Sequence, residues 1–311
     1  MSYFNRHLDE IYDQISIDEY DQISIDDHLE SLRAKGLKYR VKHTKSGDSL
    51  LEIEIYPINP VWKELEGKER AKASLPSREA QKNLNQANKV KSILRLLHAN
   101  FTTEDIWCTF VYDHEYMPAD MKEAVNHLKN YFRRLKRHIK KNELPELKYI
   151  YVTERVENEK TGKIHAHHHL VMNFRDRDTA EKLWKLGGRT EAKRLQPDPD
   201  GTFTQLANYL AKTETKEGNR RGSKTYVPSK NLARPKTTKS DYRLPKTDYR
   251  ISKKRVTEMA LNENKAIEVL EKHYPGYKVA GDIKPKFSDY TAGAYMYVCM
   301  ARKDAHRVDR R

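Results

Sequence analysis

The sequence predicts an α+β protein in which helices pack on a central antiparallel sheet of about five strands, and three observations support this class. First, 106–112 has the composition of a strand and 117–141 follows with apolar residues at helical spacing. Second, 147–154 and 164–174 are two further strand-like segments. Third, only residues 155–163, a turn-forming stretch around ENEKTGK, separate them, which is too short for a parallel crossover and therefore indicates an antiparallel hairpin.

The remaining elements follow in order along the chain. Residues 37–58 are typical of two strands joined by a Ser-Gly-Asp turn, and 63–100 have a helical pattern rich in Lys and Arg. After the hairpin we expect a helix over 177–186, a short strand over 189–195, a Pro-Asp-Pro-Asp-Gly turn and a helix over 203–212. Beyond Pro235 the chain is basic and punctuated by proline, with a helix expected over 252–273 and a strand over 294–301.

These patterns divide the chain into four regions. We expect an acidic N-terminal segment over 1–35, a hairpin with a basic helical extension over 36–84, the main α+β domain over 85–235 and a basic extension over 236–311. The acidic segment contains a tandem repeat, DQISIDEY followed by DQISIDDH. It is interpreted either as a solubilising tail or as a short amphipathic element that mimics the charge of DNA and covers a basic groove.

Charge gives the first indication of a partner. The 311 residues include 60 Lys and Arg against 45 Asp and Glu, which gives a net charge of +15 and a pI near 9.5. Residues 9–30 are acidic and contain no Lys or Arg, so the rest of the chain is still more basic. Such an excess is typical of proteins that neutralise phosphates, and nucleic acid is the expected partner.

Other compositional features exclude several protein classes. No apolar run approaches the roughly 18 residues of a membrane span, so no membrane partner is expected. The N-terminus is acidic and lacks the pattern of a secretory signal, which favours a cytoplasmic location. The two cysteines, Cys108 and Cys299, are too few for a disulfide framework or a four-thiolate zinc site.

Four histidines lie within the five residues 165–169. Because side chains alternate along a strand, His165, His167 and His169 share one face and His168 points to the other. Imidazoles bind first-row divalent ions, and a carboxylate among them shifts the preference toward Mn²⁺ or Mg²⁺. Glu154, at the end of the partner strand, is the natural carboxylate; the alternative is that these histidines only form surface hydrogen bonds.

Tyr209 and Lys212 lie three residues apart on the helix expected over 203–212, so their side chains share one face. A tyrosine hydroxyl is a poor nucleophile, but it can attack a phosphodiester when a cation draws charge from the phosphate and a nearby lysine stabilises the anion. The pair therefore suits covalent phosphoryl transfer. The spacing alone is not specific, because Tyr39 and Lys42 show it too.

Three segments, taken in order, resemble the motifs of a known family. They are WCTFVYDHEYMP over 107–118, VTERVENEKTGKIHAHHHLVMNF over 152–174 and NYLAKTETKE over 208–217. Together they resemble the HUH endonucleases, and within them the Rep-type rolling-circle replication initiators of phages, plasmids and integrated elements, the group that includes filamentous-phage gene II protein. The resemblance covers about 85–235 and implies the Rep nuclease fold for that region.

The resemblance also implies roles for individual residues. His167 and His169 match the two metal-binding histidines, with Glu154 as third ligand, and Tyr209 matches the nucleophile with Lys212 one turn along. Thr109 and Tyr112 fall in the first motif, whose role is structural or DNA-contacting. Two departures stand out: His168 occupies a position that is usually hydrophobic, and His165 offers a second register, either replacing a ligand or supporting one.

The implied activity is that of a site-specific single-strand DNA nickase and strand transferase. With a divalent ion, Mg²⁺ or Mn²⁺, Tyr209 would attack a phosphate of single-stranded or extruded origin DNA. A 5′-phosphotyrosine and a free 3′-OH result, the 3′-OH primes a host polymerase, and the displaced strand is later rejoined. No helicase motif is found, so a host helicase is expected to unwind the DNA. Basic residues of the following loop are expected to hold the DNA backbone: Arg220, Arg221, Lys224, Lys230 and Arg234.

Three alternatives stay open. Within the same chemistry, the protein is a conjugative relaxase or a single-strand transposase, although relaxases usually carry the tyrosine near the N-terminus. From a different class, it is a non-catalytic DNA-binding or copy-control protein on the same fold. The third is a metal-dependent nuclease that uses water in place of tyrosine.

Overall fold

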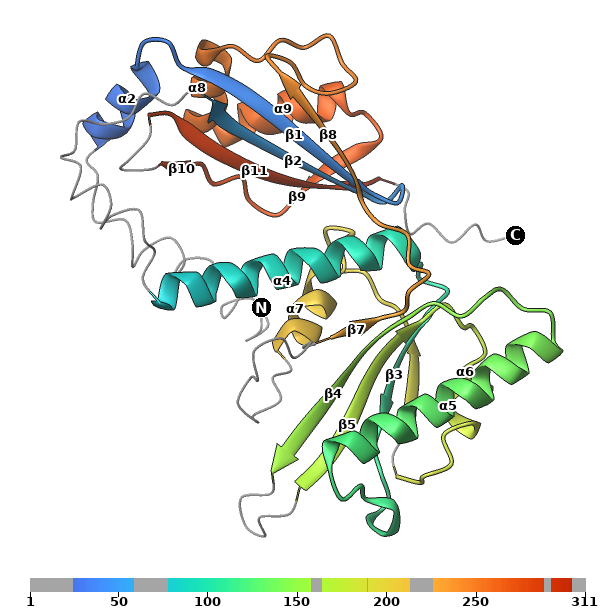
Figure 1. Ribbon diagram of the computed structural model, residues 1–311. Coiled ribbons are helices and arrows are strands. Elements are labelled where there is room, and N and C mark those ends of the chain that lie inside the picture. Colours follow the sequence, from blue (N-terminus) through green and yellow to red (C-terminus); the bar gives the residue numbers. More distant parts are fainter. Residues whose placement is uncertain are drawn as a thin grey trace. The chain divides into compact units, whose positions relative to one another are not determined.

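The computed structural model describes residues 25–58, 78–157, 164–188, 190–212, 226–287 and 292–303 (Figure 1). The acidic repeat before residue 25 and most of the predicted ENEKTGK turn lie outside these ranges. The chain divides into two compact units: unit 1 comprises Met1–Lys45, Leu50–Asn88 and Lys236–Lys303, and unit 2 comprises Ser46–Ser49, Lys89–Pro235 and Asp304–Arg311. Each unit has its own sheet.

Unit 2 contains a five-stranded antiparallel sheet. Its strands are β3 (Ile106–Phe110), β4 (Tyr149–Glu157), β5 (Ile164–Met172), β6 (Thr190–Arg194) and β7 (Val227–Pro228). They lie in the order β6-β3-β5-β4-β7, so β5 is central and pairs with β3 on one side and β4 on the other. The predicted α+β class, with helices on an antiparallel sheet of about five strands, is confirmed.

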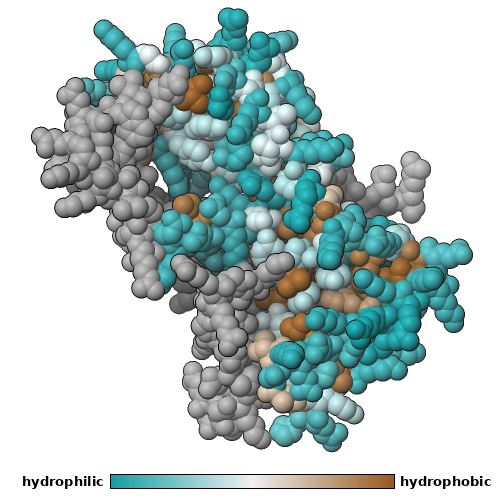
Figure 2. Space-filling model, in the orientation of Figure 1, coloured by the Kyte–Doolittle hydropathy of each residue, from teal (hydrophilic) through white to brown (hydrophobic). Residues whose placement is uncertain are grey.

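One face of this sheet is covered by α5 (Met121–Lys141), with α6 (Arg177–Lys182) beside it. The helix begins where the Asp120 side chain accepts a hydrogen bond from the Glu123 N–H at 2.7 Å. Its buried stripe of Leu128, Phe132 and Leu135 packs with Cys108 and Phe110 of β3 in one core cluster. The other side of α5 is hydrophilic (Figure 2), which agrees with its many lysines and arginines.

The opposite face carries α7 (Thr204–Lys212). The second half of α4 (Arg78–Asn100), from Lys89 onward, also belongs to unit 2 and holds α7 at both ends. His98 accepts a hydrogen bond at Nε2 from the Phe203 N–H, and the Lys89 ammonium donates to the Ala211 carbonyl. These contacts cap the otherwise unpaired backbone groups of a short helix and fix its position.

Unit 1 is built from segments far apart in the sequence. Its strands are β1 (Lys38–Ser46), β2 (Leu50–Ile58), β8 (Lys236–Asp241), β9 (Tyr277–Ala280), β10 (Lys286–Phe287) and β11 (Ala294–Arg302), in the order β10-β11-β2-β1-β8 with β9 also paired to β11. The predicted 37–58 hairpin is confirmed. No pattern in the sequence indicated that it forms one sheet with strands from 236–302.

The predicted single helix over 252–273 is wrong. The chain instead forms α8 (Lys253–Leu261) and α9 (Glu263–His273), and both contribute to the core of unit 1. Asn262 separates them: its N–H closes the end of α8 on Glu258, while its side chain accepts from the Lys265 N–H at 3.1 Å and caps α9. An asparagine that favours a helix N-cap therefore overrides the continuous apolar spacing.

No helix in the described ranges is long and apolar enough to cross a membrane.

Candidate active site

The histidines of β5 divide between the two faces of the sheet, as the alternation predicts. His168 faces the α5 core with Ala166 and Leu170, whereas His169 lies on the α7 face. The register pairs His169 with Thr109 on β3 and with Val152 on β4, and it pairs His167 with Glu154. The sheet therefore brings residues from three strands to one place.

His169 is at the centre of this place and only 3% exposed. Its Nε2 lies 3.2 Å from the Glu154 carboxylate, which comes diagonally across the β4–β5 pair. The hydrogen bond from His169 lowers the pKa of Glu154, so this carboxylate is held in its charged form. An imidazole and a carboxylate, both metal-binding groups, are thus in direct contact.

Tyr209 reaches the same ring nitrogen from α7. Its hydroxyl is 3.2 Å from His169 Nε2, and the two rings meet edge to face with centroids 5.1 Å apart. Burial, and then the charge of Glu154, raise the pKa of Tyr209, so the group is a neutral phenol here. The side chain is nevertheless 42% exposed, so it is accessible from solvent.

The approach of Tyr209 depends on how α7 begins. The Asp198 carboxylate accepts from the Gln205 N–H at 2.9 Å and, more weakly, from the Thr202 hydroxyl. The Pro-Asp-Pro-Asp-Gly turn predicted from the sequence thus supplies the cap of the helix that carries the tyrosine. His98 also accepts a hydrogen bond from the Phe203 N–H, so side chains from the turn and from α4 together position the start of α7.

Two residues of β3 complete the site, and for one of them, Trp107, the sequence motifs suggested no role. Trp107 stacks on the His169 ring, with centroids 5.5 Å apart and planes 5° apart, and meets the Tyr209 ring edge-on. Thr109, singled out only as a member of the first motif, places its hydroxyl 3.3 Å from His169 Nδ1. The strand alternation of β3 was the available signal, because Trp107 and Thr109 share a face.

His168 behaves as a core residue. Its side chain is fully buried, with Nε2 hydrogen-bonded to the Tyr112 hydroxyl at 2.8 Å and Nδ1 to the Thr153 hydroxyl at 2.9 Å. Burial, reinforced by neighbouring histidines, lowers the pKa of His168 to about 3, so the ring is neutral. A histidine thus fills a position that is usually hydrophobic in the family that the motifs resemble.

The residues expected to bind a metal are partly assembled. In the part of the chain that the structure describes, no three His, Cys, Asp or Glu side chains converge closely enough to hold an ion. Glu154 and His169 are in contact with each other, and His167 lies opposite Glu154 in the register. This donor set of one carboxylate and two imidazoles has the chemistry that Mn²⁺ or Mg²⁺ accepts.

Other predicted residues lie beside the site or outside the described ranges. Lys212 is exposed in the last turn of α7, one turn beyond Tyr209. Lys230 and Arg234 are exposed in the segment after β7. The His165 side chain and residues Arg220, Arg221 and Lys224 lie outside the described part; in the backbone register His165 faces Val156.

Comparison with known proteins identifies one family. Residues 105–217 match the model of the replication-associated protein family named for ORF2 and the gene II protein, a range that includes β3, the β4–β5 hairpin and α7. The resemblance to Rep-type replication proteins, predicted from the three motifs, is confirmed at this level. No curated protein and no solved structure matches the chain significantly.

Proposed function

From the match of residues 105–217 to this replication-associated family, we propose that the protein is a rolling-circle replication initiator that nicks origin DNA with a tyrosine nucleophile. The nick leaves a 5′-phosphotyrosine on the protein and a free 3′-OH on the DNA, and a later attack by a 3′-OH rejoins the displaced strand. The domain that does this is 85–235, the region predicted from the motifs.

One observation carries the proposal: the Tyr209 hydroxyl and the Glu154 carboxylate both lie 3.2 Å from His169 Nε2. An imidazole, a carboxylate and a phenol thus meet at one point beside a half-exposed side chain. The first two are ligands for a divalent cation, and the third is a nucleophile toward phosphorus when such a cation is present. In a replication-associated protein, this combination suits reaction with a DNA phosphate.

Each residue has a distinct role in the proposed reaction. Glu154, His169 and His167 would hold Mg²⁺ or Mn²⁺, with His165 as the alternative ligand or support. A bound ion would polarise the scissile phosphate and stabilise its developing charge. The Tyr209 oxygen forms the new bond to phosphorus as the bond to the 3′ oxygen breaks. The phenol proton passes to solvent, and the departing 3′ oxygen takes a proton from solvent to become the 3′-OH. Lys212 adds positive charge next to the phenolate as it forms.

The expected DNA is single-stranded or extruded, because a strand free of its complement can bring one phosphate to the half-exposed Tyr209 side chain. Lys230 and Arg234, and with them Arg220, Arg221 and Lys224, would neutralise its phosphates. Priming by the free 3′-OH implies a host polymerase, and separation of the strands implies a host helicase.

The test compares the protein with its Tyr209→Phe variant on labelled single strands that tile both flanks of its gene, with Mn²⁺ or with EDTA. We expect a covalent protein-DNA band on a denaturing gel that requires metal and is absent from the variant. Tyr116→Phe is the matched control, because Tyr116 is similarly exposed at 47% and lies outside the site.

The other outcomes separate the alternatives. Cleavage without a covalent band would indicate water as the nucleophile, as in a metal-dependent nuclease. Binding of one flank without cleavage would leave a DNA-binding or copy-control protein. A band that persists in Tyr209→Phe would assign the nucleophile to another residue.

A further inference from the structure

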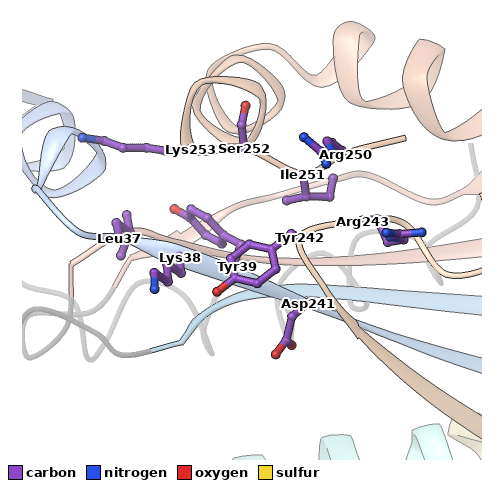
Figure 3. A pocket seen from close by; sticks show the side chains of 10 residues that line it. All are labelled: Leu37, Lys38, Tyr39, Asp241, Tyr242, Arg243, Arg250, Ile251, Ser252 and Lys253. Carbon is purple, nitrogen blue, oxygen red and sulfur yellow. The ribbon is translucent and has the colours of Figure 1, made fainter. Parts of the chain in front are cut away.

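Unit 1 contains a hollow that the proposed nicking reaction does not use. Its volume is about 470 Å³, and it lies where the start of β1, the end of β8 and the start of α8 meet (Figure 3). Four of the ten residues that line it are basic: Lys38, Arg243, Arg250 and Lys253. Because α8 begins at Lys253, the positive end of the helix dipole also faces this region.

Two of these cations are held opposite each other. Arg243 and Arg250 form an antiparallel β-bridge, so their side chains are directly opposed, and both are exposed. Like charges in such a pair repel. Within the described residues neither guanidinium has an acidic partner. The arrangement is therefore electrostatically incomplete and would be stabilised by an anion.

The one acidic residue that lines the hollow does not supply that charge. The Asp241 carboxylate is bound by the Arg40 guanidinium through two hydrogen bonds of 2.5 and 2.9 Å. Figure 3 shows its side chain pointing away from Arg243 and Arg250. The net charge of the lining is accordingly positive.

An aromatic side chain lines the same hollow as the cations. Tyr242 lines the hollow, is 48% exposed and has a backbone φ of +66°, which is costly for any residue except glycine. Its backbone is nevertheless fixed at both ends, since its N–H donates to the Tyr39 carbonyl and its own carbonyl accepts from the Ile251 N–H at 2.7 Å. These two hydrogen bonds thus keep Tyr242 in a strained backbone conformation with its aromatic ring about half exposed.

The loop that presents these side chains is well anchored. Leu244 and Ile251 are buried in the core of unit 1, and the Leu244 N–H donates to the Tyr249 carbonyl at 2.9 Å. The buried Tyr274 hydroxyl donates to the Pro245 carbonyl. The backbone that carries the cations and the aromatic ring is therefore held in place at several points.

From this arrangement we propose that the hollow is a second contact site for single-stranded DNA, with Arg243 and Arg250 on a phosphate and Tyr242 stacked on a base. Paired cations beside an exposed aromatic ring form the combination by which proteins hold single strands without reading their sequence. The choice of DNA rests on the proposed function. The site itself lies in unit 1 and does not depend on Tyr209 chemistry.

The experiment measures binding of a fluorescent 20-nucleotide single strand by anisotropy, using the full chain with Tyr209→Phe and EDTA so that no cleavage occurs. We expect Arg243→Ala with Arg250→Ala to weaken binding about tenfold, and the slope of log K against log salt to fall by about 0.7, the value for one phosphate of a single strand that is no longer neutralised. Lys272→Ala with Lys278→Ala is the control: it removes the same charge from exposed positions of unit 1 outside the lining.

A second variant tests the stacking contact separately. Tyr242→Gly removes the aromatic ring, and glycine adopts the positive φ at this position without strain. We expect it to weaken binding several-fold and to leave the salt slope unchanged. In the parent protein, a bromodeoxyuridine strand should crosslink under ultraviolet light to a peptide that contains Tyr242.

Two kinds of result would overturn the proposal. Equal affinities and salt slopes for the double arginine variant and its lysine control would show that the hollow does not bind DNA. Tighter binding of an RNA strand, or an equal loss of duplex binding, would reassign the ligand. Both affinity and salt slope are measured with Tyr209→Phe and EDTA, where no nicking can occur. The outcome of the nicking experiment therefore does not change them, and the two proposals can fail separately.

Discussion

The two faces of the five-stranded sheet each carry a histidine hydrogen-bonded to a tyrosine, yet the two pairs differ in almost every physical respect. On the α5 face, His168 Nε2 and the Tyr112 hydroxyl are 2.8 Å apart, and Tyr112 is only 4% exposed. On the α7 face, His169 Nε2 and the Tyr209 hydroxyl are 3.2 Å apart, and Tyr209 is 42% exposed. The same two residue types thus form a buried pair, His168 with Tyr112, called the closed pair below, and a half-exposed pair, His169 with Tyr209, called the open pair.

The difference lies in what surrounds each pair. Both ring nitrogens of His168 have neutral hydroxyl partners, so the ring is satisfied and buried as part of the core. His169 faces a charged carboxylate and an exposed phenol at a single nitrogen. Neighbouring histidines of one cluster therefore differ: the strand alternation places His168 in the buried core and His169 in the proposed site.

The largest effect is expected from breaking the open pair. His169→Ala should lower the rate of covalent adduct formation about 1,000-fold, because it removes a proposed metal ligand and with it several kcal/mol of transition-state stabilisation. Adduct formation should be timed on single-stranded origin DNA. His114→Ala, at an exposed position away from the site, should react at the parent rate. Near-parent activity of His169→Ala would remove His169 from the mechanism.

Breaking the closed pair should affect stability instead. His168→Leu leaves the buried Tyr112 and Thr153 hydroxyls without their partner, which costs about 2–3 kcal/mol and lowers Tm by roughly 5–10 °C. Thermal unfolding followed by circular dichroism measures this. Adding Tyr112→Phe should recover part of the loss, since both members of one hydrogen bond are then removed. A large fall in the activity of folded His168→Leu would contradict the division between the faces.

This division could be predicted from the sequence because it depends only on the period of a strand. The hairpin 147–174 fixes which histidines share a face, and a carboxylate at Glu154 follows from the same pattern. The contact with Tyr209 could not be derived in that way. It depends on Asp198 and His98, which position α7 through hydrogen bonds between residues up to 105 positions apart.

Unit 1 shows a second limit of prediction. The pairing of β1 with β8 joins residues about 200 positions apart, as in the Arg40–Asp241 ion pair. β8 has the sequence KTTKSD and is mostly exposed, so it has no apolar alternation to identify it as a strand. The basic hollow arises where β8 ends, and a charged segment that looks featureless in sequence becomes a defined surface only through this pairing.

The smallest effect is expected from a substitution beside the open pair that leaves both His169 and Tyr209 in place. Thr109→Val keeps the shape of the side chain but removes the hydroxyl 3.3 Å from His169 Nδ1. Because partners of this kind orient a ligating imidazole and fix its tautomer, adduct formation should fall about tenfold, and more Mn²⁺ should be needed for half-maximal activity. If the Thr109 hydroxyl has a purely structural role, Thr109→Val should change Tm without changing the Mn²⁺ requirement. Thr109→Ser restores the hydroxyl and should recover both the parent rate of adduct formation and the parent Mn²⁺ requirement. If Thr109→Val retains the parent rate and Mn²⁺ requirement, the Thr109 hydroxyl does not orient His169. The stacked Trp107 ring and the Glu154 carboxylate would then suffice to hold the imidazole, whereas the closed pair depends on a hydrogen bond at each ring nitrogen.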